Sequence, residues 1–183
     1  TAGIDRPFIQ KCLDAKAPFD ILTIHPYRGK LVESGFMTEL NSVADLVSNR
    51  QTWITEMGWS TQVGNIDERT QAQLLARTYL SAVASGACQN ISWYDFRDDG
   101  SDPFYFESNF GVIRQDFTPK PAYRALATVC NTLAAVPLRG YEQQLSNVFV
   151  LQSSTALAVW ATTQPATVRF DVTSGSPNIK NLM

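Results

Sequence analysis

Three short apolar runs, separated by stretches of helical periodicity, constrain most strongly what this chain can fold into. The runs cover residues 19–27, 52–59 and 90–96. Before the first run, between the runs and after the third, apolar side chains recur every three or four residues over segments of helical length. Strands that alternate with amphipathic helices are typical of an α/β fold whose parallel strands are buried on both faces.

Local signals indicate where the expected helices begin and end. Asp5 and Asp67 are placed to cap the first and third helices, and Gly86 is placed to end the third. We expect Thr38 to open the second helix and Thr118 the fourth.

Two architectures fit this pattern, a doubly wound sheet and part of a (β/α)8 TIM barrel. The G-x-G-x-x-G loop of a dinucleotide-binding sheet is absent from the sequence. Beyond residue 140, short β-rich runs separated by Ser, Thr, Gln and Pro indicate an antiparallel sheet. We therefore predict a parallel α/β domain at residues 1–138 and a partial β-sandwich accessory domain at residues 139–183.

The number of strand–helix units falls short of a closed barrel. Three such units cannot close a barrel of eight, and a short parallel sheet would leave an unpaired edge. We therefore expect the chain to be a segment of a longer polypeptide, with the rest of the barrel upstream.

Charge and cysteine content argue against several classes of partner. The 15 basic and 17 acidic residues are scattered, so neither nucleic acid nor a membrane surface is an expected partner. No apolar run approaches the ~20 residues of a membrane span. The three cysteines lack C-x-x-C spacing and the chain has one histidine, so we expect no metal site and no cofactor. Small buried thiols are the favoured interpretation, and a bridge between Cys88 and Cys130 stays open.

Polar side chains stand at the ends of the first two apolar runs. Strand alternation puts His25 and Tyr27 on one face of the first run. The same rule groups Glu56 with Thr52 and Ile54 and points it inward at the rim. A buried glutamate must be hydrogen-bonded, paired in a structural ion pair, or used in chemistry.

The aromatic residues near these ends have two interpretations each. Trp59 is either a platform for a sugar ring or a hydrophobic plug. In the third run, alternation puts Trp93 and Asp95 on one face and Tyr94 on the other. The following loop, "RDDGSDP", is predicted to be a solvated turn whose carboxylates meet sugar hydroxyls or Arg97; its spacing departs from that of an EF-hand calcium loop.

Carbohydrate suits this mixture of side chains. Sugars present apolar CH faces to aromatic rings and hydroxyls to carboxylates and amides, and cleaving their bonds requires carboxylates. The strand ends contain no nucleophilic Ser-His pair and no second histidine for a metal.

At these motifs the sequence resembles the clan A glycoside hydrolases, which are retaining (β/α)8-barrel enzymes, and more narrowly family 39. The similarity rests on "DILTIHPY", "TWITEMGWST" and "ISWYDFRDDGSDP" as sixth, seventh and eighth strands, and continues through "NFGVIRQDFTPKPAYRAL". It covers about residues 5–134 and implies the C-terminal portion of the barrel, about strands 6 to 8. The β-rich remainder resembles the accessory sandwich of such enzymes.

The resemblance implies roles for individual residues. Glu56 falls at the clan's nucleophile, Tyr27 would hydrogen-bond it with His25 alongside, and Trp93 or Tyr94 would floor the sugar subsite. The implied substrate is a β-linked glycan or oligosaccharide, met by a full-length protein that is secreted or extracytoplasmic.

The clan's acid/base, a glutamate that usually follows Asn on the fourth strand, has no counterpart here. The remaining glutamates fall in predicted loops, helices or the β-rich segment: Glu33, Glu39, Glu68, Glu107 and Glu142. A retaining mechanism needs two carboxyl groups roughly 5 to 5.5 Å apart, so we expect the isolated chain to be inactive. The alternatives are a non-catalytic carbohydrate-binding or scaffold barrel and a phosphate-ligand barrel enzyme, the latter disfavoured because the strand ends lack a Gly-rich phosphate grip.

Overall fold

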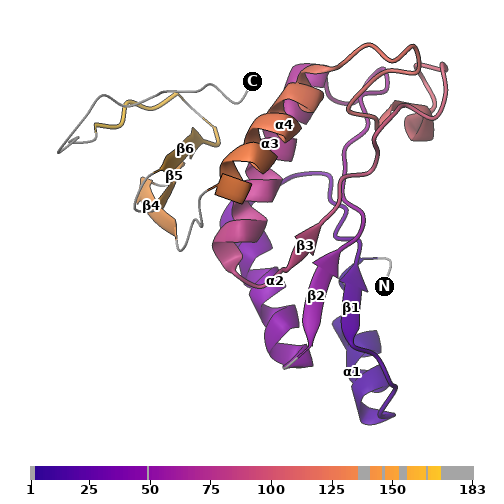
Figure 1. Ribbon diagram of the computed structural model, residues 1–183, viewed down its shortest axis with the longest axis vertical. Coiled ribbons are helices and arrows are strands. Elements are labelled where there is room, and N and C mark those ends of the chain that lie inside the picture. Colours follow the sequence, from indigo (N-terminus) through magenta and orange to yellow (C-terminus); the bar gives the residue numbers. More distant parts are fainter. Residues whose placement is uncertain are drawn as a thin grey trace.

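The computed structural model describes residues 3–48, 50–135, 141–145, 147–152, 156–163 and 165–169. Its helices and strands form a parallel sheet with helices on one side, and a second, antiparallel sheet beside the helices (Figure 1). In chain order the elements are α1 (Arg6–Asp14), β1 (Ile21–Ile24), α2 (Glu33–Val47), β2 (Gln51–Ile54), α3 (Glu68–Ser85), β3 (Asn90–Ile91), the 3-10 helix η1 (Phe106–Asn109), α4 (Pro121–Ala135), β4 (Tyr141–Leu145), β5 (Val148–Gln152) and β6 (Leu157–Ala161).

The first sheet has the parallel order β1-β2-β3. Ile24 pairs with Ile54, and Ile54 pairs with Ile91. Helices α2 and α3 connect successive strands, as in any βαβ unit. The predicted α/β class is confirmed, and the carboxyl ends of all three strands lie at one edge of the sheet.

The core lies between this sheet and its helices. Ile24 and Ile54 are fully buried against Phe36 and Leu40 of α2. A second cluster, formed by buried residues such as Leu75 of α3 and others of α4, joins those two helices. The sheet is therefore held on its helix side by a continuous apolar layer that fixes where its strand ends lie.

The predicted capping residues of α1 and α3 are confirmed. Asp5 accepts a hydrogen bond from the Phe8 amide at 2.9 Å, and Asp67 accepts one from the Thr70 amide at 2.6 Å. Gly86 ends α3 in the left-handed conformation, with φ of 66°.

The predicted starts of α2 and α4 are wrong. Helix α2 begins at Glu33 and not at Thr38, with the Glu33 carboxylate in its first turn, where the helix dipole favours an acidic residue. The same carboxylate is buried in an ion pair with Arg77 of α3, 2.6 Å away. Helix α4 begins at Pro121 and not at Thr118, because the Thr118 carbonyl accepts a hydrogen bond from the Arg114 amide.

The third apolar run forms a shorter strand than predicted. Strand β3 ends at Ile91, and the chain beyond it turns toward the returning segment, where the Val112 amide donates to the Asp95 carbonyl. Gly58 sits against this turn, since a Cβ there would lie 2.0 Å from the Tyr94 carbonyl oxygen. Only a glycine lets the segment after β2 approach the segment after β3 this closely.

The second sheet is antiparallel, in the order β4-β5-β6. Leu151 of β5 packs on Leu80 of α3, and the indole N–H of Trp160 in β6 donates to Glu33 at 3.1 Å. One sheet is described where a sandwich of two is expected, so the accessory sandwich stays a prediction. Its proposed boundary at residues 138 and 139, and its last part at residues 170–183, lie outside the described residues.

All three cysteines are free thiols. The bridge left open between Cys88 and Cys130 is therefore not formed. Cys12 and Cys88 are partly buried and Cys130 is exposed, which departs from the expectation of small buried thiols. Burial raises the pKa of Cys88 to about 12. Within the described parts of the chain, no helix has the length and apolar character to cross a membrane.

Candidate active site

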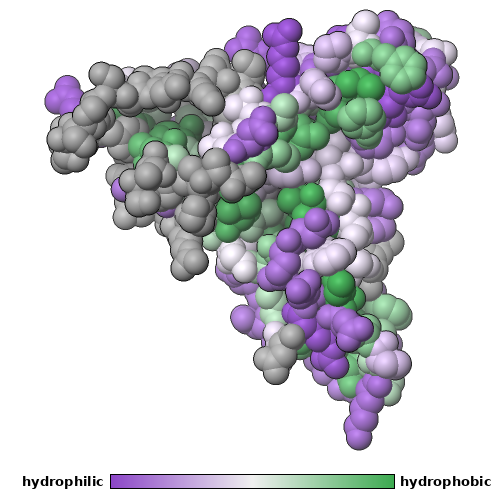
Figure 2. All heavy atoms as spheres, viewed as in Figure 1, coloured by the Kyte–Doolittle hydropathy of each residue, from purple (hydrophilic) through white to green (hydrophobic). Residues whose placement is uncertain are grey.

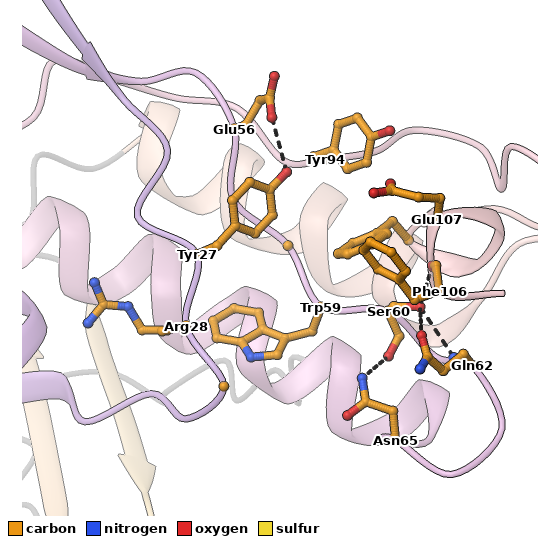
Figure 3. Close-up of a pocket in the computed structure, with 13 residues that line it drawn as sticks. Tyr27, Arg28, Glu56, Trp59, Ser60, Gln62, Asn65, Tyr94, Phe106 and Glu107 are labelled. Carbon is orange, nitrogen blue, oxygen red and sulfur yellow. Dashed lines mark hydrogen bonds between the residues drawn. The ribbon is translucent and has the colours of Figure 1, made fainter. Parts of the chain in front are cut away.

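An open pocket of about 830 Å³ lies where the carboxyl ends of the parallel strands meet. Figure 3 shows Tyr27 reaching to Glu56 within it, with Tyr94 and Glu107 drawn on the other side of the opening. The pocket is lined by Tyr27, Arg28, Gly29, Glu56, Gly58, Trp59, Ser60, Gln62, Asn65, Tyr94, Phe106, Glu107 and Phe110.

Two of the predicted site residues, Tyr27 and His25, converge on the carboxylate of a third, Glu56. The Tyr27 hydroxyl donates a hydrogen bond to Glu56 Oε2 at 3.2 Å, and His25 Nδ1 lies 3.4 Å from the same oxygen. His25 Nε2 is hydrogen-bonded to Thr55 Oγ1 at 2.9 Å, which fixes the orientation of the imidazole ring. The carboxylate therefore has a phenol donor and an oriented histidine on the side of β1.

Glu56 reaches the pocket by a route other than the predicted strand alternation. Thr52 and Ile54, which were expected to share its face, are buried on the helix side of the sheet. Strand β2 ends at Ile54, and past Thr55 the backbone leaves the strand, so Glu56 comes to the same side as His25. Its side chain is 41% exposed, which suits contact with a ligand better than a buried structural ion pair.

Tyr27 is a hydrogen-bond donor throughout the neutral pH range. Burial first, and then the nearby Glu56 carboxylate, raise the pKa of Tyr27 well above its usual value. The phenol consequently keeps its proton and can only stabilise the ionised form of Glu56 through the bond that it donates.

The tryptophans lie beneath the pocket. Trp59 is only 4% exposed, and its ring packs on that of Trp93 with the centroids 5.9 Å apart. This burial favours the interpretation of Trp59 as a hydrophobic plug, but Trp59 also lines the pocket, so its role as a sugar platform stays a prediction. Trp93 packs against the core and does not line the pocket, so of the two candidate floor residues Tyr94 is the one in contact with the cavity.

Tyr94 and Asp95 have different surroundings. The Tyr94 hydroxyl donates to Asp99 at 3.2 Å, and burial followed by the Asp99 charge raises the pKa of Tyr94 to about 12. Asp95 was predicted to bind substrate, but it does not line the pocket. Burial, with the charges of Asp99 and Asp98 as further causes, raises the pKa of Asp95 to about 7. The turn from β3 carries Asp95 away from the cavity.

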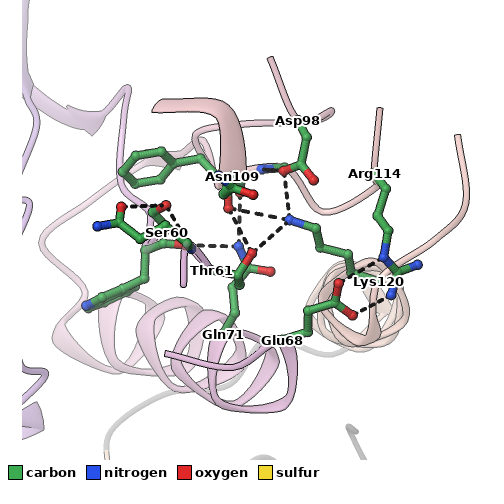
Figure 4. A network of polar contacts seen from close by, with 12 residues as sticks. Ser60, Thr61, Glu68, Gln71, Asp98, Asn109, Arg114 and Lys120 are labelled. Atoms are coloured by element: carbon green, nitrogen blue, oxygen red, sulfur yellow. Dashed lines mark hydrogen bonds and ion pairs between the residues drawn. The ribbon is translucent and has the colours of Figure 1, made fainter. Parts of the chain in front are cut away.

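A buried ion pair holds the loop after β3 in place (Figure 4). Asp98 and Lys120, exposed by 6% and 2%, approach to 2.7 Å. Asp98 also accepts the Gly111 amide at 2.8 Å. The predicted solvated turn, with Arg97 as partner, is therefore wrong for Asp98, because Lys120 arrives from the start of α4. Arg97 instead lies over the Phe117 ring.

The same lysine ties this loop to the segment after β2. Lys120 Nζ donates to Thr61 Oγ1 at 3.2 Å and to the Asn109 carbonyl at 3.4 Å. Gln71 of α3 adds hydrogen bonds to the carbonyls of Trp59 and Phe110. Two walls of the pocket are thus fixed relative to each other by buried polar contacts.

Glu107 and its aromatic neighbours are pocket residues that the sequence reasoning missed. Glu107 lies on η1, between Phe106 and Phe110, which both line the cavity. The sequence "PFYFES" offered a usable signal, since it sets a glutamate among aromatic residues as "TWITEMGW" does.

Two observations bear on metals and cations. The described residues contain no group of three or more His, Cys, Asp or Glu positioned to hold a metal ion. Arg28 is the pocket's basic residue, and its guanidinium pairs with Glu39 at 2.9 Å while lying over the Phe36 ring.

Comparison with known proteins concerns the family and the fold of the chain. A family model described as "Glycosyl hydrolase catalytic core" matches residues 6–110. No curated protein matches the chain. Among solved structures, the fold is similar to a family 39 glycoside hydrolase from the gut symbiont Bacteroides cellulosilyticus WH2, with a TM-score of 0.76 and 26% identity over 88% of this chain and 38% of that chain.

Two further similarities concern the fold alone, because the identities are low. A monomeric beta-xylosidase from Caulobacter crescentus CB15 matches with a TM-score of 0.54 and 17% identity, over 91% of this chain and 39% of that chain. A beta-glucuronidase from Bacteroides uniformis matches with a TM-score of 0.52 and 16% identity, over 68% of this chain and 16% of that chain. The present chain spans less than two fifths of the length of the family 39 enzyme from Bacteroides cellulosilyticus.

Proposed function

The chain belongs to the glycosyl hydrolase catalytic core family, and from that premise we propose that it is the C-terminal portion, about strands 6 to 8, of the (β/α)8 TIM barrel of a retaining, family 39-like enzyme of clan A. The match to the family model and the similarity to the family 39 enzyme support this proposal. So does the parallel order β1-β2-β3, in which successive strands join through helices.

In this proposal Glu56 is the nucleophile. The single observation that carries it is the convergence of Tyr27 and His25 on the Glu56 carboxylate at the mouth of the pocket. The carboxylate would attack the anomeric carbon through an oxocarbenium-like transition state and form a covalent glycosyl-enzyme. The Tyr27 hydroxyl would orient the attacking oxygen and hold the carboxylate ionised.

The substrate in this proposal is a β-linked glycan or oligosaccharide. Tyr94, Phe106 and Phe110 give the pocket aromatic faces suited to the CH faces of a sugar ring. Glu107 and Gln62 add polar groups that can meet hydroxyls. His25 acts on the carboxylate and lies outside the cavity lining.

We further propose that the acid/base is not among the 183 residues. Three of the remaining glutamates are engaged in ion pairs with arginines, namely Glu33, Glu39 and Glu68. Glu107 faces the pocket, but from η1, after the position of the eighth strand. A retaining mechanism needs an acid as well as a nucleophile, so the isolated chain should not turn over ordinary glycosides.

An activated inactivator tests the nucleophile without the acid. A 2-deoxy-2-fluoro-β-glycoside with a dinitrophenolate leaving group needs no proton on that group, so Glu56 alone can form the glycosyl-enzyme. We expect mass spectrometry to find one sugar on the peptide that contains Glu56, and none in Glu56→Gln. The matched control Glu107→Gln should still be labelled. Labelling at another residue would remove Glu56 from the role.

The same measurement addresses a second candidate, a non-catalytic carbohydrate-binding or scaffold barrel. The observation in its favour is that three of the other glutamates are engaged in ion pairs with arginines, so they do not offer Glu56 a second catalytic carboxyl group. A chain that binds the fluoro-glycoside reversibly, with no covalent label at Glu56, would favour this second function.

A further inference from the structure

We propose that the rim loop, defined as residues 102–107, is a binding surface for a further sugar unit of an uncharged β-linked glycan, beyond the unit held in the pocket. The inference rests on the proposed function and extends it to the length and charge of the substrate.

The rim loop exposes three consecutive aromatic side chains. Phe104, Tyr105 and Phe106 are exposed by 71%, 54% and 46%. Figure 2 shows hydrophobic side chains gathered over the loops between β3 and α4, at the upper right of that face. A contiguous exposed apolar patch of this kind marks an interaction surface, since single exposed aromatics are ordinary but clusters are not.

These rings continue those of the pocket. Tyr27, which bonds Glu56, meets the Phe110 ring edge to face with the centroids 6.2 Å apart. Phe110 meets Phe106 at 5.9 Å, and Phe106 meets Tyr105 at 5.9 Å, again edge to face. An unbroken series of aromatic contacts therefore joins the partner of the proposed nucleophile to the exposed rim loop. A glycan leaving the pocket on this side would stay in contact with aromatic faces.

The rim loop is held in shape before any ligand binds. The Asn109 side-chain amide donates to the carbonyl oxygens of Asp102 and Tyr105, both at 2.8 Å. Ser60 Oγ donates to the Phe106 carbonyl at 2.6 Å. Binding to a preorganised surface avoids the cost of ordering a loop, so the exposed rings are ready to stack on a ligand.

The charges around the pocket favour an uncharged glycan. Glu56 and Glu107 both line the cavity, and among the described residues Glu107 makes no ion pair. The guanidinium of Arg28 is already paired with Glu39. A chain of uronic acids would bring like charges together, whereas the hydroxyl groups of a neutral sugar can donate hydrogen bonds to these carboxylates.

Ligands of two lengths distinguish binding at the rim loop from binding in the pocket. The probes are xylobiose and xylotetraose, and cellobiose and cellotetraose, titrated calorimetrically into the full chain. For at least one series we expect the tetrasaccharide to bind about tenfold or more tightly than the disaccharide. The variant Phe104→Ala/Tyr105→Ala should abolish that difference and leave disaccharide affinity unchanged. Because both rings are exposed, its melting temperature should equal that of the wild type.

Phe8→Ala is the matched control, since Phe8 is 52% exposed on α1 and does not line the pocket. It should keep the full preference for the tetrasaccharide. If the disaccharide binds and the double variant still prefers the tetrasaccharide, the inference is wrong and the proposed function stands. Failure of both lengths in both series to bind would overturn the carbohydrate function of the pocket and the inference with it.

Discussion

The hydroxyl of Tyr27 and the carboxylate of Glu56 meet at 3.2 Å although they follow different strands. Tyr27 comes after β1 and Glu56 after β2, and these strands pair in parallel with Ile24 opposite Ile54. Both side chains therefore leave the same edge of the sheet. The phenol keeps its proton, because its pKa is raised, and so it acts on Glu56 only as a donor.

Tyr27→Phe removes that donor and keeps the ring. A hydrogen bond to a charged group contributes about 1.5–3 kcal/mol, so we expect the rate of Glu56 labelling by the fluoro-glycoside to fall about tenfold to a hundredfold. Mass spectrometry of labelling against time measures the rate. The control Tyr123→Phe removes an exposed phenol on α4 and should label at the wild-type rate. Equal rates for Tyr27→Phe and wild type would show that the hydrogen bond does not serve the carboxylate.

Lys120→Met should destabilise the fold strongly. It leaves the buried Asp98 carboxylate without its partner, and breaking a buried ion pair from one side costs about 3–5 kcal/mol. Adding Asp98→Asn removes the stranded charge and keeps an acceptor for the Gly111 amide, so the double variant should regain much of the loss. Urea denaturation of both variants measures the free energies of unfolding.

The matched control for that prediction is Arg114→Met. Arg114 pairs with Glu68 through two hydrogen bonds and also donates to Thr118 and Pro119, but the pair is partly exposed. Its loss should therefore cost clearly less than the loss of Lys120, because water solvates the carboxylate that is left. Similar destabilisation by Lys120→Met and Arg114→Met would mean that burial of the Asp98 pair has no special consequence.

Sequence was sufficient for the parts of the fold governed by local signals. The apolar run at residues 19–27 contains β1, and the run at residues 52–59 contains all of β2 except Gln51. Asp5 and Asp67 cap the helices that they were expected to cap. The start of α2 was misplaced although Glu33, an acidic residue in the first turn, is a local signal for a helix start. The pairing of Glu33 with Arg77, 44 positions away, is what no local pattern carries.

The same distinction between local signals and long-range contacts applies to the site residues. His25, Tyr27 and Glu56 could be predicted together because each follows a strand whose carboxyl end lies at one edge. Glu107 was missed although its aromatic neighbours offered a signal, because its place at the pocket depends on a loop held by the Asp98 pair with Lys120, 22 positions apart. Asp95 was assigned by strand alternation to a strand that ends earlier, at Ile91.

Asp95 should make the fold less stable as pH rises. In the folded protein the pKa of Asp95 is raised to about 7, while the pKa of an aspartate in an unfolded chain is about 3.9. Between these values the folded state holds a proton that the unfolded state has lost, so stability falls as pH increases from about 4 to about 7.

Asp95→Asn should abolish this dependence. Allowing for partial exposure, we expect the variant to melt about 2–4 °C above the wild type at pH 8, which corresponds to about 1 kcal/mol, and to match it near pH 4. Differential scanning calorimetry across that range measures both. A constant difference between the two proteins at every pH would exclude ionisation of Asp95 as the cause.

Glu107→Gln should change which glycans bind. The carboxylate lines the pocket without an ion-pair partner among the described residues, so it repels anionic sugars. Cellotetraose and β-1,4-tetraglucuronate differ only at C6 and serve as paired probes. We expect the variant to raise the affinity for tetraglucuronate about tenfold relative to cellotetraose, since tenfold corresponds to 1.4 kcal/mol of relieved repulsion. Glu39→Gln frees the Arg28 guanidinium next to the same pocket and should shift the preference in the same direction. If neither variant alters the ratio of the two affinities, the pocket's charge does not select its ligand.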